Sequence, residues 1–71
     1  MSNTLDLHGV KHADVEDKVA AFIDKHMGES TMLKIITGNS AFMKYEVIKV
    51  VEQYGLRHSD IQSASITCWT E

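Results

Sequence analysis

The 71-residue sequence contains no proline, a single cysteine, no low-complexity tract and no internal repeat. Because no proline-rich or biased segment separates two units, residues 1–71 are expected to form one domain. Cys68 has no second cysteine to pair with, which excludes an intramolecular disulfide and favours a reducing, cytoplasmic setting. A chain of this size is near the lower limit at which one hydrophobic core suffices.

The sequence also lacks the features that direct a chain to a membrane. No apolar run is long enough to cross a bilayer, and residues 1–4 have neither the basic nor the apolar region of a signal peptide. We therefore expect no membrane partner. The 44% content of hydrophobic residues is typical of a globular protein and argues against disorder.

A basic excess is missing too, since the formal net charge is −3. Proteins that bind polyanions are usually basic, which weighs against a nucleic-acid partner. The charge is uneven, however: residues 1–30 carry three basic and six acidic side chains, whereas residues 31–70 carry four basic and three acidic. We expect any binding to nucleic acid to be weak and salt-dependent. The acidic first helix also suits a protein partner.

Apolar residues recur with two periods along the chain. The spacing predicts helices at residues 13–27 and 42–54, where apolar residues recur every three or four positions. Strands are expected at residues 5–9, 32–37, 56–58 and 65–69. This order, β-α-β-α-β-β, predicts an α/β two-layer sandwich, in which a small mixed sheet carries two helices on one face. Cys68 should face the helices. Trp69 should face away from them, either stacking on a base or, as we favour, covering an open sheet edge.

The first strand, Leu5-Asp6-Leu7-His8-Gly9, places polar and apolar side chains on opposite faces. Its leucines should face the helices, while Asp6 and His8 lie side by side on the other face and Gly9 turns the chain away. Two solvated polar residues on an open sheet face are the plainer alternative. The spacing of His8 and His12 is that of a metal pair on a helix, but Gly9 intervenes, so we reject a zinc site.

The segment Thr37-Gly38-Asn39-Ser40 leads directly from a strand into a helix, where unpaired amides and the helix dipole favour an anion. Gly38 permits close approach, Ser40 adds a hydroxyl, and Lys44 lies one turn further on. Ligands of parallel β-α units gather at the carboxyl ends of the strands, where His8-Gly9 and Thr37-Gly38 both lie. A connector capped by Asn39 or Ser40, with no ligand, is an equally good interpretation.

Taken together, the L-D-L-H-G strand, a helix, and the segment Ile35-Ile36-Thr37-Gly38 before a second helix resemble the Smr (small MutS-related) domain family. That family is marked by an L-D-x-H-G strand followed by an H/T-G-x-G turn, and the resemblance covers nearly the whole chain. The first motif matches fully, whereas Ser40 replaces the last glycine of the second, a T-G-N-S form typical of small phage-encoded and bacterial members. The chain also lacks the glycine-rich hairpin that many members have before the last strand.

The resemblance implies a fold like the C-terminal domain of translation initiation factor three and an endonuclease that cuts RNA or nicks DNA. His8 would be the general acid or base, because histidine exchanges protons near neutral pH, and Asp6 would orient its ring. The substrate would be bound by Gly9, His12, Thr37, Gly38, Asn39, Ser40 and Lys44. Asp6 is the one obvious carboxylate, so we expect no metal site and no cofactor, and leave open a loosely bound Mg²⁺. The competing interpretation is a non-catalytic module that binds nucleic acid or a protein.

Overall fold

The computed structural model describes residues 3–60 and 64–70, so residues 1 and 2 of the segment 1–4 lie outside it. The described chain has the element order β-α-β-α-β-β that the sequence predicts. Five elements begin and end within one residue of their predicted bounds, and the first strand is the exception. The elements are β1 (Thr4–Asp6), α1 (His12–His26), β2 (Met32–Ile36), α2 (Ala41–Gln53), β3 (Arg57–Ser59) and β4 (Ser65–Trp69).

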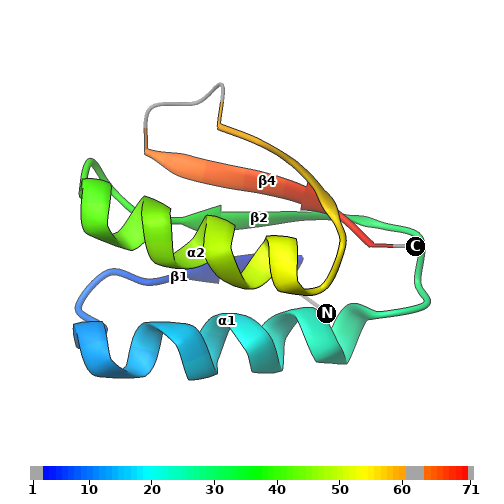
Figure 1. Cartoon of the computed structure of the whole chain (residues 1–71), viewed down its shortest axis with the longest axis horizontal. Coiled ribbons are helices and arrows are strands. Elements are labelled where there is room, and N and C mark those ends of the chain that lie inside the picture. The colour runs from blue at the N-terminus through cyan, green and yellow to red at the C-terminus, as the bar shows by residue number, and fades with distance from the viewer. Residues whose placement is uncertain (1–2, 61–63, 71) are drawn as a thin grey trace.

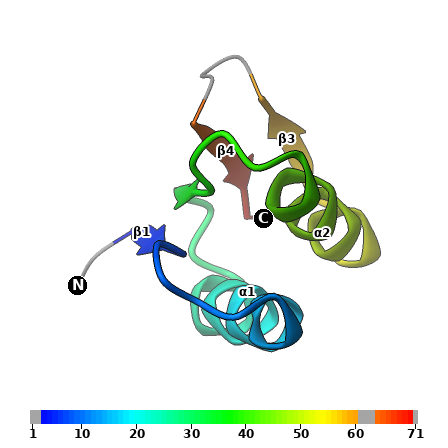
Figure 2. The same ribbon diagram turned by 90° about the vertical axis from the view of Figure 1, so that its left-hand side faces the viewer.

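The four strands form one mixed sheet in the order β1-β2-β4-β3. β1 and β2 are parallel, while β4 is antiparallel to both β2 and β3. Seen along the strands, both helices lie on one side of the sheet (Figure 2). The small α/β domain with two helices on one face is therefore confirmed. β4 lies inside the sheet, so the expectation that Trp69 covers a sheet edge is wrong.

The core lies between the sheet and the two helices. α1 contributes side chains four residues apart, so that they form a single stripe along the helix. The strands contribute alternate residues, and Cys68 is fully buried on the helix side, as expected. Each buried aliphatic side chain contributes about 1.5–3 kcal/mol. The fully buried apolar residues are Leu7, Val15, Val19, Ile23, Leu33, Ile35, Val47, Val50, Val51, Ile66 and Cys68.

The two helices are joined by a polar contact as well as by core packing. The Tyr54 hydroxyl lies just after α2 and approaches two acceptors on α1, the Asp24 carboxylate at 2.8 Å and the Ala20 carbonyl at 3.3 Å. The hydrogen bond to Asp24 raises the pKa of Tyr54 above its usual value, and burial of the phenol adds a smaller increase. Because the phenol must keep its proton to donate, this contact belongs to the neutral form.

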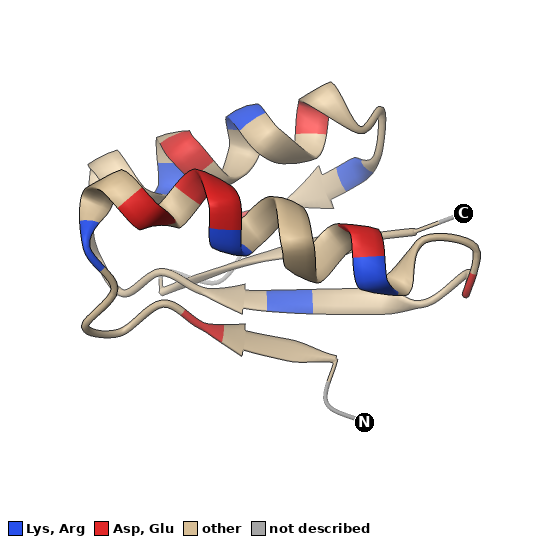
Figure 3. Ribbon diagram, turned by 90° about the horizontal axis from the view of Figure 1, so that it is seen from below, with Lys and Arg blue, Asp and Glu red and all other residues tan. Residues whose placement is uncertain are grey.

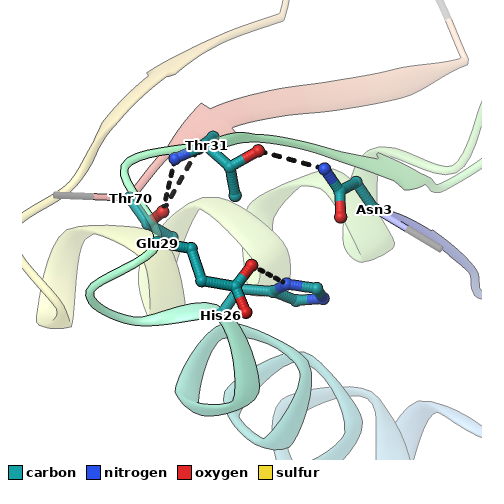
Figure 4. A network of polar contacts seen from close by, with 5 residues as sticks. All are labelled: Asn3, His26, Glu29, Thr31 and Thr70. Atoms are coloured by element: carbon teal, nitrogen blue, oxygen red, sulfur yellow. Dashed lines mark hydrogen bonds and ion pairs between the residues drawn. The ribbon is translucent and has the colours of Figure 1, made fainter. Parts of the chain in front are cut away.

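A polar network closes the end of the molecule where α1 stops and β2 begins (Figure 4). The Thr31 backbone N–H donates to the Thr70 hydroxyl at 3.0 Å, and that hydroxyl donates back to the Thr31 carbonyl at 3.2 Å. The Asn3 side-chain amide donates to the Thr31 hydroxyl at 3.0 Å. Nearby, Nδ1 of the buried His26 ring lies 2.8 Å from Oε1 of Glu29. These contacts bring together the segments before β1, after α1 and after β4.

Candidate functional site

The loops that follow β1 and β2 lie together at one end of the molecule (Figure 1, left). The parallel pairing of β1 with β2 brings this about, because it aligns the carboxyl ends of the two strands. Just beyond β1, the Leu7 backbone N–H donates to the Ile36 carbonyl at 3.0 Å, so the two segments of the chain separate only after these residues. The turn that contains His8 and the turn formed by residues 37–40 thus lie at the same end of the molecule, as the sequence predicts.

The first strand ends at Asp6, so the prediction that it continues to Gly9 is wrong. The chain instead forms a turn, in which the Val10 N–H donates to the Leu7 carbonyl at 3.0 Å. Gly9 supports this turn with a φ of +78°, a left-handed conformation that side chains other than glycine rarely adopt. His8 therefore lies in an exposed turn and not on the sheet face beside Asp6.

Asp6 acts on the backbone of this turn. Its Oδ1 accepts a hydrogen bond of 2.8 Å from the His8 backbone N–H, the arrangement by which an aspartate commonly stabilises the turn that follows it. The expectation that Asp6 orients the imidazole ring through a direct contact is not met in this structure. Asp6 instead holds the peptide unit that carries His8, and so positions that residue through the main chain.

The second turn is tied to the segment before β4. The backbone N–H groups of Thr37 and Gly38 both donate to the Ala64 carbonyl, at 2.9 and 3.0 Å. The Thr37 side chain is buried and donates to the Gly38 carbonyl at 2.9 Å. The prediction that the Gly38 amide binds an anion is therefore wrong, because that amide already has an acceptor. Gly38 is needed for its φ of +67°.

Ser40 caps α2, as one of the two alternatives predicts. Its Oγ accepts a hydrogen bond of 3.2 Å from the Met43 backbone N–H, and its carbonyl accepts one of 3.1 Å from the Lys44 backbone N–H. A hydroxyl that accepts still has its own proton to donate. Asn39 is exposed in the turn ahead of it, and Lys44 is half-buried in the first turn of the helix. This end of α2 is suited to a negative charge because the helix dipole is positive there.

His12 contacts the start of the second helix. It is the first residue of α1, and its ring stacks on that of Phe42 in the first turn of α2. The centroids are 4.2 Å apart and the planes differ by 26°. Sequence reasoning missed Phe42, although its position off the apolar stripe of α2 was a usable signal, because an aromatic ring outside the core can contact a neighbouring element.

This end of the molecule thus presents two histidines, His8 and His12, and the start of the 13-residue helix α2, which His12 contacts through Phe42. Within residues 3–60 and 64–70, no three His, Cys, Asp or Glu side chains lie close enough to hold a metal ion. In the same ranges, neither helix is long and apolar enough to cross a membrane. No family model, curated protein or solved structure matches the chain.

Proposed function

We propose that this chain is an Smr-like phosphodiester-handling domain, an endonuclease that cuts RNA or nicks branched DNA. One observation carries the proposal, namely that the His8 turn and the turn leading into α2 both follow the carboxyl ends of two parallel strands, at the same end of the molecule. The observed element order agrees with the fold that the resemblance implies, that of the C-terminal domain of translation initiation factor three. The family that we propose rests on the motif L-D-L-H-G, and the geometry supports a site at that motif.

In the proposed reaction, His8 removes a proton from the attacking hydroxyl or water, and returns a proton to the leaving oxygen. General acid–base catalysis of this kind contributes roughly 10²–10⁴-fold. In the proposal, the phosphoryl oxygens lie at the start of α2, where the Ser40 hydroxyl, the positive end of the helix dipole and Lys44 favour negative charge. Asp6 is a positioning residue, because it holds the His8 peptide. We propose a reaction that needs no metal or depends only weakly on Mg²⁺.

The test is a cleavage assay on end-labelled single-stranded RNA and branched DNA, with Mg²⁺ or with EDTA. We expect His8→Ala to lower the cleavage rate about 100-fold or more while the circular dichroism spectrum stays unchanged. His58→Gln is the matched control, because His58 lies on β3, which β4 and β2 separate from β1. Equal rates for the wild type and His8→Ala would refute the catalytic assignment.

The second candidate function is a module that binds nucleic acid or a protein without cutting it. It is favoured by the contact of Asp6 with a backbone amide, which leaves the His8 ring without the carboxylate partner that catalysis would use. The net charge of −3 points the same way. In the assay above, this alternative predicts a shift of labelled RNA in a binding gel, weakened by salt, with no cleavage product from either substrate.

A further inference from the structure

The face of the sheet opposite the helices carries a defined set of side chains. On β2, the buried residues Leu33 and Ile35 point to the core, so Met32, Lys34 and Ile36 point the other way. On β4, the buried residues Ile66 and Cys68 leave Thr67 and Trp69 on that same side. We call this side the open face, and it consists of Thr4, Asp6, Met32, Lys34, Ile36, Arg57, Ser59, Ser65, Thr67 and Trp69.

The strand register arranges the open face in rows across the sheet. Trp69 is paired with Met32 on one side and with Arg57 on the other. The Arg57 guanidinium carbon lies 5.7 Å from the centre of the Trp69 ring, which is a cation–π distance. Met32 is 55% exposed, and the Trp69 side chain is half-buried. The next row pairs Thr67 with Lys34. An aromatic ring thus lies in the interior of the sheet, with two cations close by.

Charge is divided between the two sides of the domain. The helices carry most of the acidic residues (Figure 3), namely Asp14, Glu16, Asp17, Asp24, Glu46 and Glu52. On the open face, Lys34 and Arg57 are basic, and the one acidic residue, Asp6, lies at the end next to the His8 turn. The domain is therefore acidic overall, yet the two charged side chains that neighbour Trp69 among the described residues of the open face, Lys34 and Arg57, are basic and complement an anionic partner.

We propose that the open face binds single-stranded nucleic acid, with one base stacked on Trp69 and phosphates paired with Lys34 and Arg57. This inference rests on the proposed function and names the substrate class for it. A single strand is required because the bases of a duplex are stacked on each other and cannot reach the ring. A second copy of this chain does not fit face to face, because Lys34 and Arg57 of the two copies would repel each other.

The open face leads to the candidate site. The row of Trp69 and Met32 and the row of Ile36 and Asp6 are four residues apart along β2, which is about 13 Å at the usual strand rise. A nucleic-acid strand that is bound at Trp69 and runs along β2 therefore reaches the end of β1 and the His8 turn within a few nucleotides. The stacking position and the proposed phosphate position can be occupied by one molecule.

Binding can be measured directly because Trp69 is the one tryptophan in the sequence. We propose to titrate the protein, at low salt, with an oligouridylate of about 12 nucleotides and with a duplex RNA of equal length. Stacking on Trp69 should quench its fluorescence, and the single strand should bind at least about tenfold more tightly than the duplex. Raising the salt concentration should weaken this binding.

Variants separate this surface from the rest of the molecule. By fluorescence anisotropy of a labelled oligouridylate, Trp69→Ala should bind about tenfold more weakly, and Trp69→Phe should recover part of the loss. Lys34→Gln should weaken binding and flatten its salt dependence. Lys25→Gln is the matched control, since Lys25 is exposed on α1, and it should bind like the wild type. Equal affinities for Lys34→Gln and Lys25→Gln, in folded proteins, would overturn the proposal.

Two further outcomes would also overturn it. One is an absence of quenching by the oligouridylate at low salt, and the other is a dimer in light scattering whose formation alone changes the Trp69 fluorescence. The fate of the proposed nuclease is read separately. Oligouridylate binding that needs Trp69, without cleavage of any substrate, supports the open face and rejects the nuclease. Cleavage that is unaffected in rate and KM by Trp69→Ala supports the nuclease and rejects the open face.

Discussion

The ring of His12 stacks on the ring of Phe42, with the ring centroids 4.2 Å apart. The two residues stand at the beginnings of the two helices, next to the turns that form the candidate site. The stack is partly open to solvent, since the Phe42 side chain is 44% exposed. It therefore acts as a surface clamp between the helix beginnings, separate from the buried core.

Replacing Phe42 by alanine should release this clamp. We expect the free energy of unfolding to fall by about 0.5–1.5 kcal/mol, the contribution of an aromatic pair. The His12 ring protons should also move downfield in the NMR spectrum, because they lose the ring-current shift of Phe42. Tyr45→Ala is the control, because Tyr45 is 66% exposed on the same helix and should leave the His12 signals unchanged. Unchanged His12 signals in Phe42→Ala would contradict the stack.

The role of Asp6 can be separated from catalysis by a conservative variant. Asp6→Ala removes the acceptor of the His8 amide and should lower the free energy of unfolding by roughly 0.5–1.5 kcal/mol. Asp6→Asn keeps a side-chain oxygen in the same place, so it should recover most of the stability and most of any cleavage activity. Urea titration and the cleavage rate check the two effects. A stable Asp6→Asn variant that has lost activity would show that the carboxylate charge itself is required.

The thiol of Cys68 should be inert while the protein is folded. It is fully buried, and burial raises its pKa from 9.0 to about 11. A reagent that modifies thiolates should therefore react with Cys68 in the protein unfolded by urea, but not in the folded protein in buffer at neutral pH. Fast reaction of the native protein would contradict the burial of this residue.

The same shift makes stability fall at alkaline pH. The native thiol keeps its proton to a higher pH than the unfolded one, so its contribution is present below pH 9 and is lost as the pH rises toward 11. Tyr54 acts in the same direction, since its native pKa is also raised, above 10.0. Urea midpoints measured from pH 8 to 11 should fall less steeply in Cys68→Ala and in Tyr54→Phe than in the wild type. A midpoint that rises with pH would show the sign to be wrong.

His26 should be replaceable with a gain in stability. Its ring is 1% exposed, and Nδ1 contacts Glu29, but Nε2 is buried with no hydrogen-bond partner among the described residues. An unpaired buried polar atom costs about 1–3 kcal/mol. His26→Leu removes it, while Glu29, which is 41% exposed, can bind water instead. We expect the melting temperature to rise by about 4–8 °C for each kcal/mol gained. Glu29→Gln is the control, and a lower melting temperature for His26→Leu would contradict the prediction.

Periodicity was enough to place most of the elements. The bounds of β4 agree with the predicted 65–69, and those of α1, β2, α2 and β3 differ by one residue, because buried stripes and alternating strands leave a regular pattern in the sequence. The predicted extent of the first strand was wrong for a local reason. The alternation of Leu5 to Gly9 suits a strand, but the hydrogen bond from the His8 amide to Asp6 and the left-handed Gly9 end it early. A hydrophobic pattern does not report such side-chain contacts with the backbone.

The candidate site was predicted in its position but not in its details. Parallel pairing of β1 and β2 follows from the β-α-β order, and it brings the two turns together. The hydrogen bonds from the Thr37 and Gly38 amides to the Ala64 carbonyl join residues far apart in the sequence, so no local pattern near Gly38 predicts them. Likewise, no local pattern indicates that β4 lies inside the sheet, which changes the place of Trp69. Such features depend on the order of the strands.

That strand order has a consequence for biosynthesis. β4 is made after β3, yet it is the element that lies between β3 and β2. Until β4 has left the ribosome, the β1–β2 pair has an exposed edge and β3 has no neighbour with which to form a ladder. The nascent chain therefore cannot assemble its sheet stepwise as it emerges from the exit tunnel. The sheet is complete only when β4 pairs with β2, and until then the edge of β2 stays unprotected for chaperones to shield.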